Sequence, residues 1–377
     1  MTPILLSILR AVFRLAKWSL IVIFAVEAVS FIVVVSSNFV LYGSRFEGSR
    51  ARYDPYALFL HRDGPRGTAF NRKSGVPSRD RLLWMLGGST TRGSTDDDAK
   101  TISSFLSRDL NRDTEGLCWT IRNFGVNSFN SLLQAKYLQK LLIEEPEKPD
   151  LVIFFDGAND ATYYAMFRTP DAHFGYNKVR GIIESYRNRW FGILKPVYAA
   201  AYASYTKELW EKITQTMTCI PQDSPELTVF ADSVKKRYAF LDRLCRLLGI
   251  QFVVFWQPTR WVETAPITPA IRNMEHSGMI SADRLPAYAH NMRVISDAVV
   301  SRVGSLGCFV DFRNVLTSRT NLVYREDGVH FLDEGRELVA KAIEATIRKR
   351  ILELRHDQAP EPAFGQSRTG ILPVGSR

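Results

Sequence analysis

Apolar runs of five to seven residues alternate with longer amphipathic stretches through most of the chain. Each run has the length of a buried strand, and the stretches between them place apolar residues at helical spacing. The predicted strands lie at residues 81–86, 118–124, 150–155, 251–256 and 308–312. The predicted helices lie at residues 101–110, 131–145, 228–248, 285–303 and 333–354. Because helices separate the strands, we expect right-handed crossovers and a mainly parallel five-stranded sheet covered on both faces.

A long apolar stretch precedes this alternation. Residues 18–44 contain no lysine or arginine, and their one carboxylate is Glu27. The stretch can cross a hydrocarbon core of about 30 Å as a helix, whereas a cleaved signal peptide has a shorter apolar region of about 7–15 residues. We therefore predict an uncleaved transmembrane anchor over 18–44, after a short N-terminal tail, 1–17. Glu27 is interpreted as protonated or reaching toward an interface, rather than as the mark of a helix partner.

The charges that flank the anchor do not fix its orientation. Arg10, Arg14 and Lys17 precede the anchor, and a similar number of arginines follows it, so the positive-inside comparison is close to a tie. A short tail before the anchor and a large domain after it favour a domain outside the cytoplasm. The predicted location is the cell inner membrane, crossed once, with a periplasmic domain.

The rest of the chain divides into segments of different composition. Residues 45–80 are polar and rich in arginine and glycine, and are predicted to be a linker or an N-terminal embellishment of a domain at 81–354. That domain carries an insertion at 161–228, whose first 50 residues hold 12 aromatic side chains. The insertion follows the carboxyl end of a strand, so it is predicted to form a substrate wall or lid, a helical subdomain, or a surface that meets the membrane. Residues 355–377 are predicted to be a disordered tail.

Composition narrows the classes of function. The net charge is +10, but the basic residues are scattered along the chain, so nucleic-acid binding is not expected. The four cysteines lack the paired spacing of a zinc site. The acidic run at 96–98 precedes a predicted helix, where acidic residues are favoured without a cation. No metal is therefore predicted.

The first predicted strand of the sheet ends on Gly87-Gly88-Ser89, where a serine could act as a nucleophile. Such a serine needs a base, and Asp327 and His330 lie three residues apart just before the last helix. A carboxylate at this spacing can orient the imidazole, which then accepts the proton of the serine hydroxyl. An ordinary α/β-hydrolase is disfavoured, because the glycine expected two residues after the serine is missing and the acid lies beside the histidine in sequence.

Acyl transfer also requires donors for the developing oxyanion. The backbone N–H of Ser89 is one candidate, and the side-chain amide of Asn159, just after the third strand, is another. The loop of small residues after the second strand offers further backbone N–H groups.

Three segments together resemble the sequence blocks of the SGNH, or GDSL-type, hydrolase family. They are "GGST" at 87–90, "GAND" at 157–160 and "DGVH" at 327–330, and the resemblance spans about residues 81–335. It implies a flavodoxin-like three-layer α/β/α sandwich and ester hydrolysis through an acyl-enzyme. Ser89 would be the nucleophile, His330 the general base and then general acid, and Asp327 the residue that orients His330. The resemblance implies no metal and no organic cofactor.

One sequence block departs from the family pattern. Ser128 occupies the place of a glycine whose backbone N–H is an oxyanion donor in the family. Serine keeps that N–H, but it would carry strain if the position needs a positive φ. The oxyanion donors implied by the resemblance are therefore Ser89, Ser128 and Asn159.

These observations predict a membrane-anchored serine hydrolase of the esterase, lipase or deacetylase type. Its partner would be an ester-containing small molecule, a lipid or an acylated glycan of the cell envelope. Three alternatives remain: an O-acetyltransferase that uses the same triad on an envelope glycan, a non-catalytic binding or assembly protein of this fold, and a membrane scaffold built on the aromatic insertion.

Overall fold

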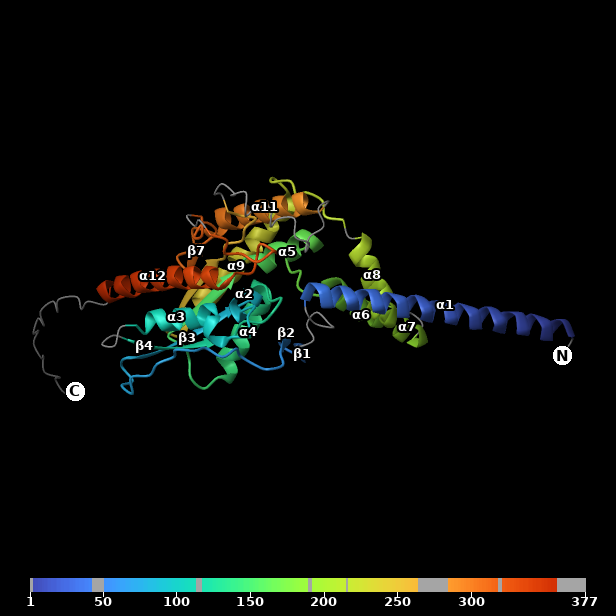
Figure 1. Cartoon of the computed structure of the whole chain (residues 1–377), viewed down its shortest axis with the longest axis horizontal. Helices are drawn as coiled ribbons and strands as arrows, with labels where there is room; N and C mark the ends of the chain where they lie inside the picture. Colours follow the sequence, from blue (N-terminus) through green and yellow to red (C-terminus); the bar gives the residue numbers. More distant parts are fainter. Residues whose placement is uncertain are drawn as a thin grey trace, which may run out of the picture.

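A five-stranded parallel sheet forms the centre of the molecule, in the strand order β4-β3-β5-β6-β7 (Figure 1). The structure is a computed structural model that describes residues 3–42, 51–112, 117–188, 192–214, 216–263, 284–317 and 321–357. The strands are β3 (Asp80–Gly87), β4 (Cys118–Asn123), β5 (Leu151–Asp156), β6 (Gln251–Trp256) and β7 (Phe309–Asp311). The predicted sheet is thereby confirmed.

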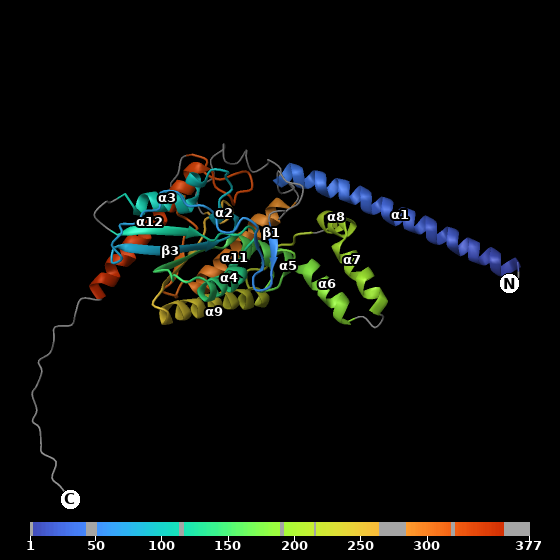
Figure 2. The ribbon, with the colours of Figure 1, turned by 90° about the horizontal axis from the view of Figure 1, so that it is seen from below.

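Helices cover both faces of the sheet, which gives the predicted three-layer sandwich (Figures 1 and 2). On one face lie α4 (Ser131–Glu144), α9 (Pro225–Leu247) and α11 (Leu285–Val303). On the other lie α3 (Ile102–Leu110) and α12 (Asp333–Asp357). Side chains alternate along each strand, so Trp84 and Phe154 enter the first core while Met85 and Ile153 enter the second.

Short polar residues begin the helices at the predicted places. The side chain of Thr101 accepts a hydrogen bond from the backbone N–H of Ser104 and caps α3. Asn130 caps α4 in the same way through the N–H of Leu133. Within the acidic run, Asp97 caps a short 3-10 helix that leads into α3, which agrees with a role at a helix start.

The N-terminal segment is one continuous helix, α1 (Pro3–Tyr42). Part of the expected tail, from Pro3 to Lys17, is therefore helical and continues into the apolar segment. Residues Ile4–Phe39 are long and apolar enough to cross a membrane, as judged by length and composition. At 1.5 Å per residue, the 40-residue helix is about 60 Å long, roughly twice the hydrocarbon thickness.

Residues 51–80 belong to the domain rather than forming a free linker. Strands β1 (Ala51–Asp54) and β2 (Leu58–His61) pair as an antiparallel hairpin. Arg66 then forms an antiparallel bridge with Asn123 at the end of β4. The described part of the expected linker therefore extends the domain at the β4 edge.

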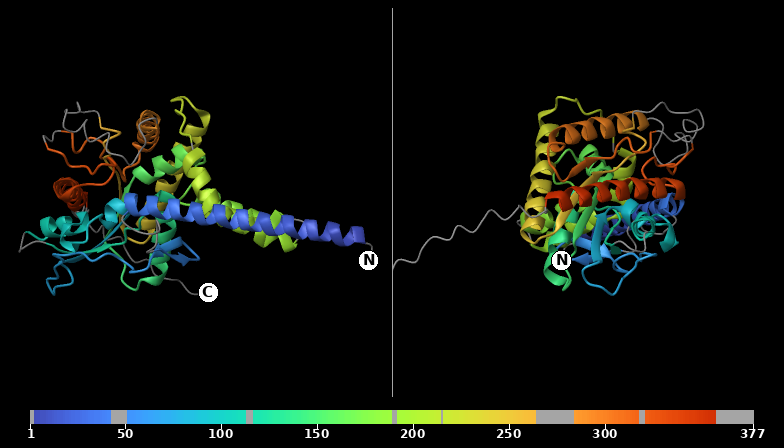
Figure 3. Two further views of the ribbon diagram at one scale, coloured as in Figure 1. Left: turned by 45° about the vertical axis from the view of Figure 1, so that its right-hand side comes forward. Right: turned by 90° about the vertical axis from the view of Figure 1, so that its left-hand side faces the viewer.

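The aromatic insertion is helical, and its last helix, α8 (Tyr205–Thr214), packs against α1 (Figure 3). It contains α5 (Ala158–Phe167), α6 (Tyr176–Asn188), α7 (Lys195–Ala203) and α8. The carboxylate of Glu27 in α1 accepts hydrogen bonds from the backbone N–H groups of Tyr205 and Thr206, at 2.7 and 3.0 Å. Glu27 therefore does mark a helix partner, and the interpretation given above is wrong. The expected tail lies outside the described residues from 358 onward.

The buried amide of Asn123 joins the end of β4 to the segment that follows β3. Its Nδ2 donates to the carbonyl oxygen of Thr91 at 2.8 Å and to Ser103 Oγ at 2.9 Å. Its Oδ1 accepts from the backbone N–H of Gly125 at 2.9 Å. Asn123 thus fixes the helix that begins with Ser89 against the neighbouring loop.

Asn123→Ala is expected to lower the free energy of unfolding by about 1–3 kcal/mol, because it leaves buried backbone groups without partners. Asn127→Ala in the same loop is the matched control, since Asn127 is exposed, and its effect should stay within about 0.5 kcal/mol. Urea denaturation of both variants measures the difference. Equal stabilities would contradict the role given to Asn123.

Candidate active site

Ser89, His330 and Asp327 form a continuous hydrogen-bonded chain. Ser89 is the first residue of the short helix α2 (Ser89–Arg92), directly after β3, and the other two lie in the loop before α12. The Ser89 Oγ and His330 Nε2 atoms are 2.7 Å apart. His330 Nδ1 lies 2.5 Å from Asp327 Oδ2. The structure thus brings together the three residues predicted for catalysis, in the order that proton transfer requires.

The surroundings of Asp327 keep its carboxylate ionised. Burial by itself would raise the pKa of Asp327, but hydrogen bonds from the His330 ring and from the backbone N–H groups of Val329 and His330 lower that pKa to about 2. A negative charge is therefore present beside Nδ1 throughout the neutral pH range. It holds the proton on Nδ1 and leaves Nε2 to accept a proton from Ser89.

Gly328 allows the loop between the acid and the base to turn. Its φ is +67°, and a Cβ at this position would lie 2.8 Å from the ring of Trp261. The indole Nε1 of Trp261 also donates to the carbonyl oxygen of Asp327 at 3.2 Å. The glycine therefore meets two requirements, a left-handed backbone and a close approach to an aromatic ring.

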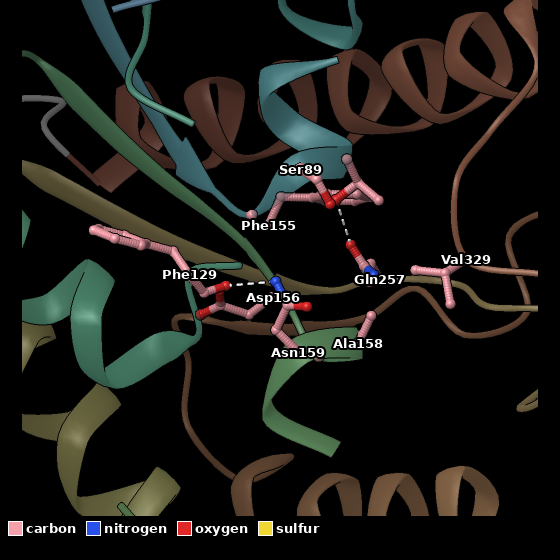
Figure 4. Close-up of a pocket in the computed structure, with 11 residues that line it drawn as sticks. Ser89, Phe129, Phe155, Asp156, Ala158, Asn159, Gln257 and Val329 are labelled. Atoms are coloured by element: carbon pink, nitrogen blue, oxygen red, sulfur yellow. Dashed lines mark hydrogen bonds between the residues drawn. The ribbon is translucent and has the colours of Figure 1, made fainter. Parts of the chain in front are cut away.

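A small cavity opens beside Ser89 at the carboxyl ends of β3, β5 and β6 (Figure 4). Its volume is about 10 Å³, which corresponds to room for roughly one water molecule. Side chains from three different loops surround it. The lining residues are Gly88, Ser89, Thr90, Phe129, Phe155, Asp156, Gly157, Ala158, Asn159, Gln257 and Val329.

Two of the three predicted oxyanion donors lie at this cavity. The N–H of Ser89 is in the first turn of α2, where backbone donors have no partner within the helix. Asn159 Nδ2 donates one hydrogen to the carbonyl oxygen of Phe129 at 2.7 Å, and an amide nitrogen carries a second hydrogen. That bond fixes the direction of the Asn159 amide at the cavity wall.

Ser128 lies one residue outside the set that lines the cavity. Its φ is +64°, so this serine adopts the left-handed conformation that favours glycine. Its carbonyl oxygen accepts from the hydroxyl of Tyr163 at 3.1 Å. The next residue, Phe129, reaches the cavity.

The two glycines before Ser89 are required by close packing. A Cβ on Gly88 would lie 2.5 Å from Asn159 Nδ2 and 3.2 Å from the carbonyl oxygen of Phe129. A Cβ on Gly87 would overlap the side chain of Thr91. A larger residue at either position would therefore displace the groups that surround Ser89.

Gln257 and Asp156 line the cavity but were not identified from the sequence. Gln257 follows β6, and its Oε1 accepts from the hydroxyl of Thr90 at 2.8 Å. Asp156 ends β5 and receives hydrogen bonds from the hydroxyl of Tyr238, at 2.9 Å, and from the amide of Gln134. Their positions at the carboxyl ends of buried strands could have indicated both, because strand ends meet at the site.

Asp156 and Asp160 form a buried carboxyl pair beneath the site. Burial raises the pKa of Asp156 well above its ordinary value, and the nearby Asp160 raises it further. Burial also raises the pKa of Asp160, while Arg237 and Ser131 oppose the rise. Asp160 accepts from the N–H and hydroxyl of Ser131, at 3.0 and 2.5 Å, and so ties α5 to the start of α4. It supports the loops rather than facing the cavity.

The left-handed backbone of Ser128 generates a stability prediction. Ser128→Gly should raise the free energy of unfolding by up to about 1 kcal/mol, because glycine adopts this φ without steric cost. Ser128→Val should lower it, since a β-branched residue tolerates positive φ poorly. Denaturant unfolding of the two variants tests this, and a glycine variant less stable than the valine variant would contradict it.

Comparison with solved structures gives matches of low sequence identity. An acetyl xylan esterase, AlAXEase, is 14% identical, with 71% of this chain and 99% of that chain covered and a TM-score of 0.37. A lipase/acylhydrolase from Enterococcus faecalis is 16% identical, with 72% and 96% covered and a TM-score of 0.39. No curated protein sequence matches the chain. Residues 85–269 match the family model described as GDSL-like lipase/acylhydrolase. Residues 85–269 therefore belong to a domain of the GDSL-like lipase/acylhydrolase family.

Proposed function

We propose that the protein is a membrane-anchored carboxylic ester hydrolase that works through an acyl-enzyme on Ser89. The observation that carries this proposal is the hydrogen-bonded chain from Ser89 Oγ through His330 to the ionised Asp327. A serine hydroxyl is a weak nucleophile, and a neutral imidazole at 2.7 Å is positioned to accept its proton as it attacks.

The proposed reaction has two halves. In the first, Ser89 Oγ bonds to the acyl carbon, His330 Nε2 takes the hydroxyl proton, and the carbonyl oxygen becomes an oxyanion. His330 then returns the proton to the departing alcohol as the ester bond breaks. In the second half, His330 takes a proton from water, the hydroxide attacks the acyl carbon, and the proton passes to Ser89 Oγ as the acid leaves.

The oxyanion donors in this proposal are the N–H of Ser89 and the Nδ2 of Asn159. Both belong to residues that line the cavity, and hydrogen bonding to Phe129 already orients Asn159. Donors held in place before the reaction need no reorganisation as charge develops on the oxygen. The N–H of Ser128 is the third donor implied by the resemblance, and we propose it for the far side of the same oxygen.

The size of the cavity favours a small acyl group. About 10 Å³ of space lies beside Ser89, and Phe129 and Phe155 are among the residues that line it. An acetyl group has only three heavy atoms and would displace fewer of the surrounding side chains than a long acyl chain would. We propose acetyl esters as the substrates, carried by a glycan or a lipid of the cell envelope.

The proposed location is the cell inner membrane, with α1 as a single anchor and the catalytic domain outside the cytoplasm. The length and apolar composition of α1 support this placement.

Fluorophosphonate labelling of the detergent-solubilised full chain tests the nucleophile. Peptide mass spectrometry should find the adduct on Ser89, and Ser89→Ala should remove it.

Asp327→Asn should lower kcat for ester hydrolysis by roughly 10³–10⁴-fold, because the imidazole loses the charge that fixes its tautomer. Asp63→Asn, at an exposed carboxylate, is the matched control and should keep full activity. A folded protein without an adduct on Ser89 would overturn the proposal.

Hydrolysis of p-nitrophenyl esters that differ only in acyl length tests the substrate class. We expect kcat/KM to fall by about tenfold or more between the acetate and the octanoate, because additional methylenes overpack the cavity. Both esters share one leaving group, so its chemistry does not enter the comparison. An octanoate hydrolysed as fast as the acetate would show that the acyl chain binds elsewhere.

A further inference from the structure

The helices α6, α7 and α8, residues 176–214, stand outside the three layers of the catalytic domain. We call them the insertion helices. Figures 1 and 2 show them beside α1 rather than over the sheet. None of their described residues lines the cavity beside Ser89, and their position beside an apolar helix favours another of the predicted roles, a surface that meets the membrane.

Polar contacts join α8 to α1 along one stripe of α1. Glu27 satisfies the first two N–H groups of α8 and accepts from the hydroxyl of Thr206 at 2.7 Å. One turn further, the buried Ser30 lies 3.3 Å from the same hydroxyl. Near the end of α1, the buried Asn38 accepts from Lys212 Nζ at 2.9 Å. Glu27, Ser30 and Asn38 of this apolar helix thus face α8, as polar residues of membrane helices face protein partners.

The stripe lies within the apolar part of α1. Glu27 is 12 residues before Phe39, where the apolar segment ends, which is about 18 Å along a helix. α8 therefore covers Glu27 along the part of α1 nearest to the catalytic domain. Without α8, that carboxylate would be exposed on an apolar helix.

The insertion helices also expose apolar side chains away from α1. Among the described residues, Ile193, Val197, Trp210 and Ile213 are between 62% and 85% exposed. The segment 176–214 carries seven lysines and arginines against three glutamates. Exposed apolar and aromatic residues combined with an excess of basic ones are typical of helices that lie in a membrane interface.

We propose that the insertion helices are a membrane-contact surface, and that their partner is the lipid bilayer that α1 enters. Ile193 and Val197 enter the boundary between headgroups and acyl chains, and the basic residues face anionic headgroups. The carboxylate of Glu27 holds α8 against α1, so that anchor and contact surface form one unit. This inference rests on the proposed anchoring by α1.

Site-specific fluorescence of the full chain in liposomes with anionic lipids tests the inference. In a Cys219→Ser background, which removes the exposed native cysteine, an environment-sensitive probe is attached at Ile193→Cys. Leu247→Cys is the matched control, because the side chains of Ile193 and Leu247 are both 85% exposed. Leu247 is the last residue of α9 and lies near the amino end of β6, whereas Ser89 lies at the carboxyl ends of the strands. Phe24→Cys, at an exposed position of α1, reports on the anchor.

We expect the probe at Ile193 to emit at shorter wavelength than the probe at Leu247. Nitroxide-labelled lipids should quench the probe at Ile193 several-fold more than the probe at Leu247, and aqueous iodide should quench it less. These results would resemble those at Phe24.

Three outcomes would overturn the inference, and they differ from one another. A probe at Ile193 that behaves like Leu247 while Phe24 is quenched by lipid refutes the contact surface and leaves the anchor intact. A probe at Phe24 that lipid nitroxides do not quench refutes the anchor, and the inference with it. Protection of Ile193 from iodide without quenching by lipid would show that a second copy of the chain covers the insertion helices.

Discussion

The hydrogen bond between Ser89 and His330 closes a loop of 241 residues, and the rest of the catalytic domain serves to hold its two ends. Ser89 is fixed by β3, which has a neighbour on each side and is buried along most of its length. His330 is fixed by α12, which packs on the same face of the sheet as α3. Because both ends are attached to one hydrophobic core, the 2.7 Å distance depends on packing far from the reacting atoms.

Four carboxyl groups of this protein have different surroundings and different roles. Asp327 is surrounded by donors, and these hold its pKa down to about 2 despite burial. Asp156 and Asp160 are more deeply buried and lie near each other, so burial raises the pKa of both. Glu27 has a structural role, because its carboxylate accepts hydrogen bonds from the backbone N–H groups at the start of α8, which have no partner within that helix. The direction of each pKa shift in the catalytic domain therefore depends on the balance between burial, nearby charges and hydrogen-bond donors.

The sheet and its covering helices could be predicted from local patterns, and the Ser89–Asp327–His330 chain from the resemblance of three sequence blocks to one family. Apolar runs indicate buried strands, and the spacing of Asp327 and His330 places both in one loop. The contacts of Glu27, Gln257 and Asp156 could not be predicted, since each depends on a residue distant in sequence. Glu27 meets Thr206 from 179 positions away, and Gln257 meets Thr90 from 167 positions away. For Ser128, the sequence predicts strain only if the backbone φ is positive, and the sequence alone does not give φ. The structure supplies the value, +64°.

The direction of the sheet connects the site to α1. Helices α2 and α5 begin at the carboxyl ends of β3 and β5, and Figures 1 and 2 both show them on the side of the sheet nearest to α1. The insertion helices follow α5 directly and extend along α1 from that side. Since reactive groups of a parallel sheet collect at its carboxyl edge, the same topology that assembles Ser89, Asn159 and His330 also turns them toward the apolar helix. The insertion follows the carboxyl end of β5. The site and the exposed apolar residues of the insertion helices therefore lie on the same side of the molecule.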